Sequence, residues 1–205
     1  MIQELRASLI DMRSDANPEV IIGDIIRKYS EPRPYHNWHH VLHCYNEYIE
    51  NKGLFRRPSI GLVTLLYHDI VYNPKRNDNE LQSALYAYQQ IEKHADPAIA
   101  ALISDGILAT KHNAIPYDTD TKLILDIDLS ILGQDWERFQ EYDAQIRQEY
   151  SFVADEQYAT ARINVLENFL NRPTIYLSDY FRTKYEMHAS KNLEKKIFML
   201  KNHIS

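Results

Sequence analysis

A histidine pair four residues apart, followed later by a histidine next to an aspartate, is the pattern in this sequence that could do chemistry. The pair is His36 and His40, and the dipeptide is His68-Asp69. On a helix, residues i and i+4 project from one face, so the two imidazoles of the pair would be neighbours. Two neutral imidazoles and a carboxylate form a mixed nitrogen and oxygen ligand set that suits a divalent metal ion. The pattern therefore predicts a metal site.

Length and charge narrow the classes of function. The chain has 205 residues, of which 44% are hydrophobic and 25% charged, as in an ordinary globular domain that buries a sizeable core. The net charge of −6 and the lack of clustered Lys and Arg argue against a nucleic-acid polymer as partner. A small phosphorylated substrate stays open, since a bound metal would supply the positive charge. The oligomeric state is not determined by the sequence, and a homodimer is possible.

Cysteine use and hydropathy predict the compartment. Cys44 is the single cysteine, so the sequence predicts neither an internal disulfide nor a thiolate cluster for zinc. The N-terminal residues include Glu4 and Arg6 and contain no long apolar stretch, so we expect no signal peptide. No run approaches the ~18 apolar residues of a membrane span. These features predict a cytoplasmic protein without a membrane partner.

Helical periodicity dominates the chain, and glycine is scarce with five residues, which predicts an all-α fold built as a single-domain helical bundle. Asp96, Asp135, Ser178 and Ser190 are candidate N-caps, the two serines for two separate C-terminal helices. Gly133 is expected to end a helix. Before the last two helices, the predicted segments are 3–14, 18–29, 36–50, 60–69, 78–94, 97–111, 120–132, 136–150 and 155–171.

The motif residues appear in the order His40, His68-Asp69 and Asp128. This order resembles the His…His-Asp…Asp signature of the HD superfamily of metal-dependent phosphohydrolases. The resemblance covers about half of the chain, and its combination of motifs is quite specific. The wider context is similar to one bacterial branch of predicted HD phosphohydrolases in the segments 33–37, 68–72, 78–84 and 126–133.

The resemblance also implies a domain organisation and a ligand set. An HD-like catalytic core would span about 20–150, with C-terminal helices of about 151–205 packing on it in a single all-α domain. The metal ligands would be His40, His68, Asp69 and Asp128.

The first histidine motif resembles a string in the cyclic-nucleotide phosphodiesterases of the same superfamily, Tyr-His-Asn-x-x-His. In those enzymes the first histidine protonates the leaving oxygen and the second binds metal. The resemblance thus implies that His36 is the general acid and that His40 is a ligand. His39 would point about 100° away on a helix, which favours a position at the rim or surface.

Asp126 and Asp128 compete for the last ligand position. Two residues apart on a helix, they diverge by about 200°, so only one can face the metal. The phosphodiesterases have Asp-Leu-Ser at the corresponding place, and this resemblance implies that Asp128 is the ligand. We expect Asp126 to be a solvated carboxylate.

Further residues have two interpretations each. Glu80 is either the capping-box partner of Asn77 or, by resemblance to an Asp-x-Glu-x-x-Ser-Ala pattern, a catalytic residue that orients the metal-bound water or a histidine. His112 matches a histidine often found between the His-Asp pair and the last aspartate in HD proteins, which implies contact with the phosphate or with a second metal. Arg33 and Lys75 are candidate phosphate contacts or solvated surface residues.

The resemblance implies a hydrolase that cleaves a phosphate ester, of a nucleotide or a related small metabolite, by metal-activated water. Asp69 would bridge a second ion if His112 or Glu80 helped to bind it. The mixed ligand set suits Mn, Mg, Zn, Fe, Co or Ni and does not distinguish among them. The alternatives are a non-catalytic ligand-binding or interaction module on an HD scaffold and an HD-type di-iron oxygenase.

Overall fold

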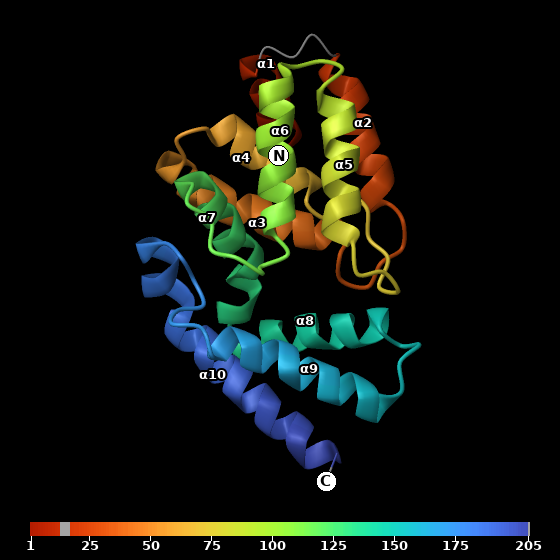
Figure 1. Ribbon diagram of the computed structural model, residues 1–205, viewed down its shortest axis with the longest axis vertical. Helices are drawn as coiled ribbons and strands as arrows, with labels where there is room; N and C mark the ends of the chain where they lie inside the picture. The colour runs from red at the N-terminus through yellow and green to blue at the C-terminus, as the bar shows by residue number, and fades with distance from the viewer. Residues whose placement is uncertain (13–16, 205) are drawn as a thin grey trace. The chain divides into compact units, whose positions relative to one another are not determined.

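The computed structural model describes residues 1–12 and 17–204, and these residues form helices and connecting loops without a strand. The all-α prediction is therefore confirmed. None of the described helices is both long and apolar enough to cross a membrane. In chain order the elements of Figure 1 are α1 (Ile2–Asp11), α2 (Pro18–Tyr29), α3 (Trp38–Asn51), η1 (Lys52–Leu54), α4 (Pro58–Tyr67), α5 (Asn79–Ile91), α6 (Pro97–Ala109), α7 (Thr119–Leu129), η2 (Ser130–Gly133), α8 (Trp136–Glu149), α9 (Asp155–Leu170) and α10 (Asp179–Ile204).

The chain divides into two compact units, residues 1–128 and 129–205, here called unit 1 and unit 2. Unit 1 contains α1 to α6 and almost all of α7, whereas unit 2 contains η2 and α8 to α10. The resemblance implies an HD-like core that ends near residue 150, whereas the observed division lies between residues 128 and 129. All the residues predicted to bind metal belong to unit 1.

Helix α4 forms the centre of unit 1. Its side chains from Leu62 to Tyr67 are at most 1% exposed, as expected for a helix that is apolar on every side. It packs against α1, α3 and α6, and Figure 1 shows α6 lying beside α5. The predicted helix 60–69 is thus present, but it ends at Tyr67, so that His68 and Asp69 lie in the turn that follows.

Asp120 fixes the start of α7 to the start of α4. Its buried carboxylate accepts hydrogen bonds from the backbone N–H groups of Arg56 and Arg57, each at 2.8 Å, immediately before α4 begins. The ends of the same two helices also meet, because His68 contacts Asp128 there. The two helices therefore run in the same direction, and this arrangement delivers one predicted ligand from each to the same place.

Several helix caps agree with the sequence. The carboxylates of Asp96 and Asp135 accept backbone hydrogen bonds at the starts of α6 and α8, each at 2.8 Å. The predicted capping box at Asn77 is wrong, because α5 begins at Asn79 and its N-cap residue is Asp78. The Asp78 carboxylate pairs with Arg76 instead of capping the helix.

The two expected C-terminal helices are one helix, α10. It begins after Ser178, as predicted, but it continues through Ser190. The buried face explains this continuity, since Ala189 and Leu193, four residues apart, are both fully buried on either side of Ser190. The predicted first helix, 3–14, ends at Asp11, and residues 13 and 14 lie outside the described part of the chain.

Gly133 has a packing role in addition to its place at the end of a helical segment. It closes η2, and its backbone is not in the left-handed conformation typical of a glycine cap. A Cβ atom at this position would lie 2.5 Å from the Cβ atom of Tyr185 on α10. Glycine is therefore required here by the close approach of η2 to α10.

We expect Gly133→Ala to destabilise the protein by about 1–3 kcal/mol, because the Cβ atom of Tyr185 cannot move without its backbone. The measurement is the free energy of unfolding in urea. Gly23→Ala is the matched control: Gly23 is an exposed helical glycine of α2 with no atom near its missing Cβ. That control should stabilise the protein by about 0.5–1 kcal/mol. Equal free energies for the two variants would contradict the packing role.

Candidate metal centre

Four side chains of unit 1 converge where α3, α4 and α7 meet. His40 comes from the first turn of α3, His68 and Asp69 from the turn after α4, and Asp128 from the end of α7. The two Nε2 atoms of the histidines lie 3.0 Å apart. Asp69 Oδ2 lies 2.9 Å from His68 Nε2 and 3.4 Å from His40 Nε2. Asp128 Oδ1 lies 3.4 and 3.5 Å from the same two nitrogens.

These distances fit a metal ion. With metal–ligand bonds of about 2.1 Å, neighbouring ligand atoms lie about 3.0 Å apart in an octahedral site and about 3.4 Å apart in a tetrahedral one. The five separations of 2.9–3.5 Å fall in this range. The two nitrogen and two oxygen donors also match the chemistry of a divalent transition ion or magnesium.

The tautomer of His68 supports the same fit. Its Nδ1 lies 2.7 Å from the carbonyl oxygen of Leu65, one turn earlier in the chain, and a carbonyl can only accept a hydrogen bond. Nδ1 therefore carries a proton and donates it, and in a neutral imidazole the Nε2 lone pair then faces the cluster. A metal-binding histidine is usually held in this way by a second hydrogen bond.

Sequence reasoning missed Cys44 as a neighbour of the cluster. Ligand atoms of His40, Cys44, His68 and Asp128 all lie within 4.8 Å of one another, and this group could hold a metal ion. Cys44 follows His40 by four residues on α3, and this spacing alone would have predicted the contact. As the single cysteine of the sequence, Cys44 was considered only for a disulfide or a thiolate cluster.

The distances favour Asp69 over Cys44 as the fourth ligand. Cys44 Sγ lies 3.8 Å from Nε2 and 3.9 Å from Nδ1 of His40. It is therefore about equally far from both ring nitrogens and packs beside the imidazole, whereas a metal would lie beyond Nε2. Asp69 Oδ2 lies 2.9 Å from His68 Nε2, which is close to the separation of about 3.0 Å between neighbouring ligand atoms of an octahedral ion.

Electrostatics prepare the site for a cation. Burial would lower the pKa of His68, but the carboxylates of Asp69 and Asp128 outweigh it and raise that pKa well above its usual value. Burial would likewise raise the pKa of each carboxyl. His68 and His36 nevertheless hold the pKa of Asp69 well below its usual range. The pKa of Asp128 is also well below its usual range, mainly because of its hydrogen bond with His112. Both carboxylates are thus ionised at neutral pH, and a divalent ion could replace the added proton of His68.

His36 reaches the site from a loop, and the predicted helical start at residue 36 is wrong. The reason is Asn37, which is the N-cap of α3: its Oδ1 accepts a hydrogen bond from His39 N at 2.8 Å. The Asn37 amide also donates to the carbonyl oxygens of Arg33 and Pro34, at 2.7 and 3.0 Å. These bonds close the loop before α3 and fix the position of His36.

The His36 ring lies at the partly exposed edge of the cluster. Its Nε2 is 3.9 Å from Asp69 Oδ2, and its side chain is 17% exposed. The ring stacks on Tyr72 with centroids 3.8 Å apart and meets Tyr35 edge-on at 4.9 Å. His36 is therefore held by two aromatic rings next to Asp69, with part of its side chain accessible from outside the cluster.

Two neighbours of predicted ligands differ in burial. His39 is exposed, as expected for a residue pointing away from the cluster. Asp126 is fully buried, so the expectation of a solvated carboxylate is wrong. The cause is the burial of α7 on most sides, since Leu125 and Ile127 next to it are also buried.

Arg33 holds the backbone around Asp69, a role that the sequence analysis did not foresee. Its guanidinium donates to the carbonyl oxygens of Asp69 at 2.8 Å and Ile70 at 3.2 Å, and its side chain is only 7% exposed. The predicted phosphate contact and the solvated alternative both assumed an accessible guanidinium. Arg33 instead positions the turn that carries His68 and Asp69.

The loop after Asp69 is held by two residues of α5. The Asn79 side chain pairs with both backbone groups of Asn73, each at 3.0 Å, and the Ser83 hydroxyl pairs with both backbone groups of Val71, at 3.0 and 3.1 Å. Glu80, between them in the sequence, is partly exposed in the first turn of α5. Asn79 and Ser83 thus support the loop, whereas the Glu80 carboxylate makes no contact with His40, His68, Asp69 or Asp128 among the described residues.

His112 contacts Asp128 on the side away from His40 and His68. Its Nε2 lies 2.9 Å from Asp128 Oδ2, whereas Oδ1 faces His40 and His68. Its backbone has a φ of 54°, a left-handed conformation that costs most residues other than glycine about 1–2 kcal/mol. Lys75, in contrast, is exposed in the loop before α5.

Comparisons of the chain with models of protein families, with curated proteins and with solved structures each give no significant match. The structure itself shows an all-helical protein whose described residues include a buried cluster that could bind a metal ion.

We expect Cys44→Ala to retain the metal content of the wild type, because the thiol packs beside the His40 ring and Asp69 is better placed to be the fourth ligand of an ion. The measurement is elemental analysis together with the near-ultraviolet spectrum of the cobalt-loaded protein. The wild type should lack the intense thiolate-to-cobalt band. Such a band, lost in Cys44→Ala, would show that Cys44 is a ligand.

Proposed function

We propose that the protein is a metal-dependent phosphohydrolase of the HD type that cleaves a phosphate ester of a nucleotide or related small metabolite. The observation that carries the proposal is the set of separations of 2.9–3.5 Å among the nitrogen and oxygen atoms of His40, His68, Asp69 and Asp128. Four donors leave coordination positions open for water and substrate in a six-coordinate site. The motif order supports the same class of reaction.

Each nearby side chain has a role in this proposal. His40, His68, Asp69 and Asp128 would hold the ion, which when bound lowers the pKa of a water molecule and polarises a phosphoryl oxygen. His36, next to Asp69 and partly exposed, would donate a proton to the leaving oxygen of the substrate.

Supporting residues would keep these groups in place. The hydrogen bond from His112 Nε2 to Asp128 Oδ2 would direct Oδ1 toward the ion. Arg33 would keep Asp69 in position through its two backbone carbonyl contacts. Lys75 would approach the substrate phosphate from the exposed loop.

Asp69→Ala should abolish both metal binding and hydrolysis while leaving the helical fold intact. The loss of metal affinity should exceed the roughly 10–100-fold cost of losing an outer hydrogen-bond partner. The measurements are elemental analysis, hydrolysis of a generic phosphoester with each divalent ion, and far-ultraviolet circular dichroism. Asp105→Ala, which removes an exposed carboxylate of α6, is the control and should change none of the three. Full activity in Asp69→Ala would contradict the ligand assignment.

His36→Gln should retain the metal but lose about 10²–10⁴-fold in kcat on alkyl phosphate esters, whose leaving oxygen needs a proton. On p-nitrophenyl phosphate the loss should be much smaller, because nitrophenolate departs without protonation. The measurement is kcat for both substrates in wild type and variant. An equal loss on both substrates would show that His36 does not act as the general acid.

A further inference from the structure

Two segments of unit 1 meet beside the metal centre, and Tyr72 connects them. The loop before α3 carries His36, whereas the turn after α4 carries His68 and Asp69, with Tyr72 three residues further on. The Tyr72 ring lies nearly parallel to the His36 imidazole, with 23° between their planes and 3.8 Å between their centroids. The proposed general acid thus faces a ring from the segment that carries two of the proposed ligands.

This face-to-face contact restricts the orientation of the His36 imidazole. At 3.8 Å the two rings are in van der Waals contact, so the imidazole cannot rotate about its Cβ–Cγ bond without driving its edge into the Tyr72 ring. The Tyr35 ring also meets His36, edge-on at 4.9 Å, but Tyr35 belongs to the same loop as His36. Tyr72 is therefore the ring that relates the orientation of His36 to the turn with the ligands.

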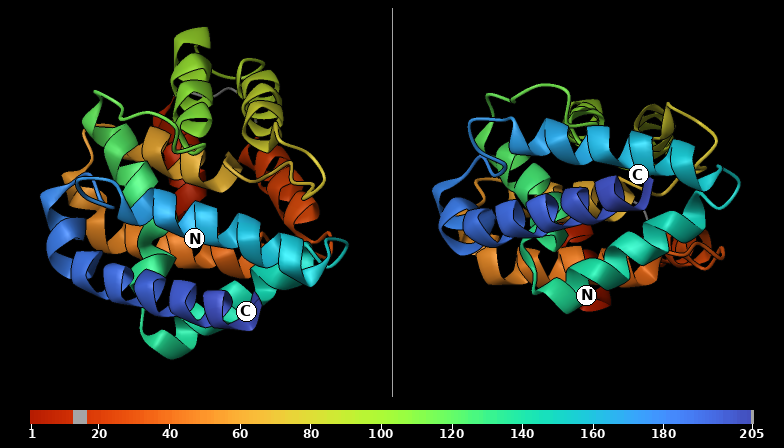
Figure 2. Two further views of the ribbon diagram at one scale, coloured as in Figure 1. Left: turned by 60° about the horizontal axis from the view of Figure 1, so that its bottom comes forward. Right: turned by 90° about the horizontal axis from the view of Figure 1, so that it is seen from below.

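The backbone on both sides of Tyr72 is fixed by α5. The Ser83 hydroxyl pairs with both backbone groups of Val71, and the Asn79 amide pairs with both backbone groups of Asn73, at 3.0–3.1 Å. Ser83 and Asn79 are buried and lie four residues apart on one face of α5, which packs along α6 (Figure 2). Tyr72 lies between two residues held in this way, so its ring is a rigid support.

Arg33 makes a second connection between the same two segments. Its Nη1 donates to the carbonyl oxygen of His36 at 3.3 Å and to that of Asp69 at 2.8 Å. One guanidinium thus links the backbone of the loop before α3 to the backbone of the turn after α4. With these backbones linked, the freedom that remains to His36 is rotation of its side chain, which the Tyr72 ring restricts.

We propose that Tyr72 is the positioning residue of the general acid: its ring holds the His36 imidazole with Nε2 toward the phosphate ester at the metal centre. The aromatic face has this role, and not the hydroxyl, because the contact is ring against ring. The inference rests on the proposed function, in which His36 protonates the leaving oxygen. A proton donor acts only within hydrogen-bonding reach of the acceptor, so loss of its orientation slows the proton transfer.

The test compares Tyr72→Leu, which removes the ring, with Tyr72→Phe, which keeps it. Tyr72→Leu should lower kcat on an alkyl phosphate ester about 10- to 100-fold, the effect of displacing a reacting group by about 1 Å. The loss on p-nitrophenyl phosphate should be much smaller, because this leaving group departs without a proton. Tyr72→Phe should restore both rates. Elemental analysis should show the wild-type metal content in both variants, since Tyr72 is not among the proposed ligands.

A double variant separates the positioning of His36 from other effects. In a protein that already carries His36→Gln, Tyr72→Leu should cause no further loss on the alkyl ester, because no imidazole is left to orient. NMR gives a readout that needs no substrate. The ring protons of His36, assigned with His36→Gln, should shift in Tyr72→Leu and stay near their wild-type positions in Tyr72→Phe, because an adjacent aromatic ring determines their shielding.

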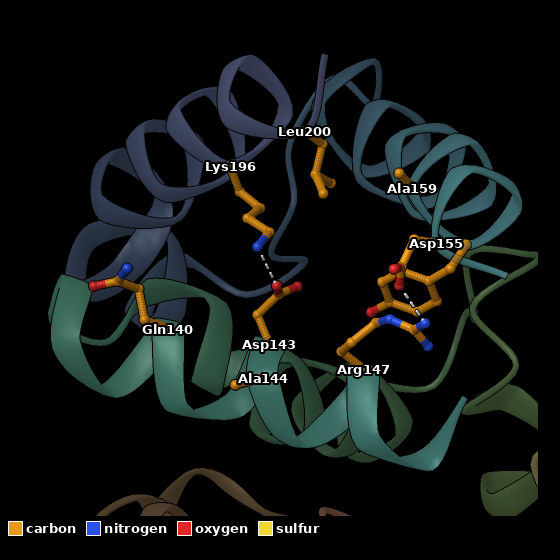
Figure 3. A pocket seen from close by; sticks show the side chains of 9 residues that line it. Gln140, Asp143, Ala144, Arg147, Asp155, Ala159, Lys196 and Leu200 are labelled. Carbon is orange, nitrogen blue, oxygen red and sulfur yellow. Dashed lines mark hydrogen bonds and ion pairs between the residues drawn. The ribbon is translucent and has the colours of Figure 1, made fainter. Parts of the chain in front are cut away.

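Lys196→Gln controls for a general loss of stability. Lys196 of α10 pairs with the buried carboxylate of Asp143 of α8 at 2.6 Å, and both residues belong to unit 2 (Figure 3). Removal of one partner of such a buried pair destabilises a fold. The control should therefore unfold more easily in urea, whereas its ratio of kcat values on the two substrates should equal that of the wild type.

The possible failures are distinguishable. If the wild type is active, an equal loss on both substrates in Tyr72→Leu, or no loss, would overturn the inference and leave the proposed function standing. Loss of metal from Tyr72→Leu, additive losses in the double variant or unchanged His36 ring resonances in Tyr72→Leu would also overturn it. A wild type that hydrolyses neither substrate with any divalent ion would overturn the proposed function, and this inference with it.

Discussion

The interpretation of unit 1 depends on the contact between the His40 and His68 imidazoles, whose Nε2 atoms lie 3.0 Å apart. Each of these nitrogens also lies within 3.5 Å of two ionised carboxylates, those of Asp69 and Asp128. Both histidines are at most 2% exposed, and burying such charges is unfavourable unless they neutralise one another or bind a cation. The two carboxylates raise the pKa of His68 well above its usual value, so a proton on that ring offsets part of their charge. A divalent ion could take the place of that proton between the same nitrogen and oxygen atoms.

The surrounding structure keeps the four donors in position by contacts to the backbone. Asp120 fixes the start of α7 to that of α4, Arg33 binds the carbonyl oxygens after His68, and Asn37 closes the loop that carries His36. Each of these side chains makes two or more hydrogen bonds, so rotation of any one of them costs several contacts. The donors therefore belong to a rigid framework, as a metal site with defined geometry requires.

The sequence predicted the features that depend on local pattern. Helix α2 has the predicted bounds of 18–29, and the caps at Asp96 and Asp135 are present, because periodicity and capping act within a few residues. His40, His68, Asp69 and Asp128 converge as their motif order implied. Their roles in binding and hydrolysis remain predictions.

Other features depend on contacts between distant segments, which pattern alone does not show. Asp126 is buried because α7 is enclosed by its neighbours, and Ser190 lies inside α10 because the buried face of that helix continues past it. The partners of Arg33 are 36 and 37 residues away along the chain. Cys44 differs, since its i+4 spacing from His40 was visible in the sequence.

The most direct test of the metal centre is the metal content of the purified protein, measured by elemental analysis together with phosphoester hydrolysis after chelation and after addition of each divalent ion. We expect at least one bound ion per chain, as the cluster geometry indicates, and hydrolysis that is lost on chelation and restored by metal. A protein that binds no ion under any of these conditions and hydrolyses no phosphoester would contradict the account.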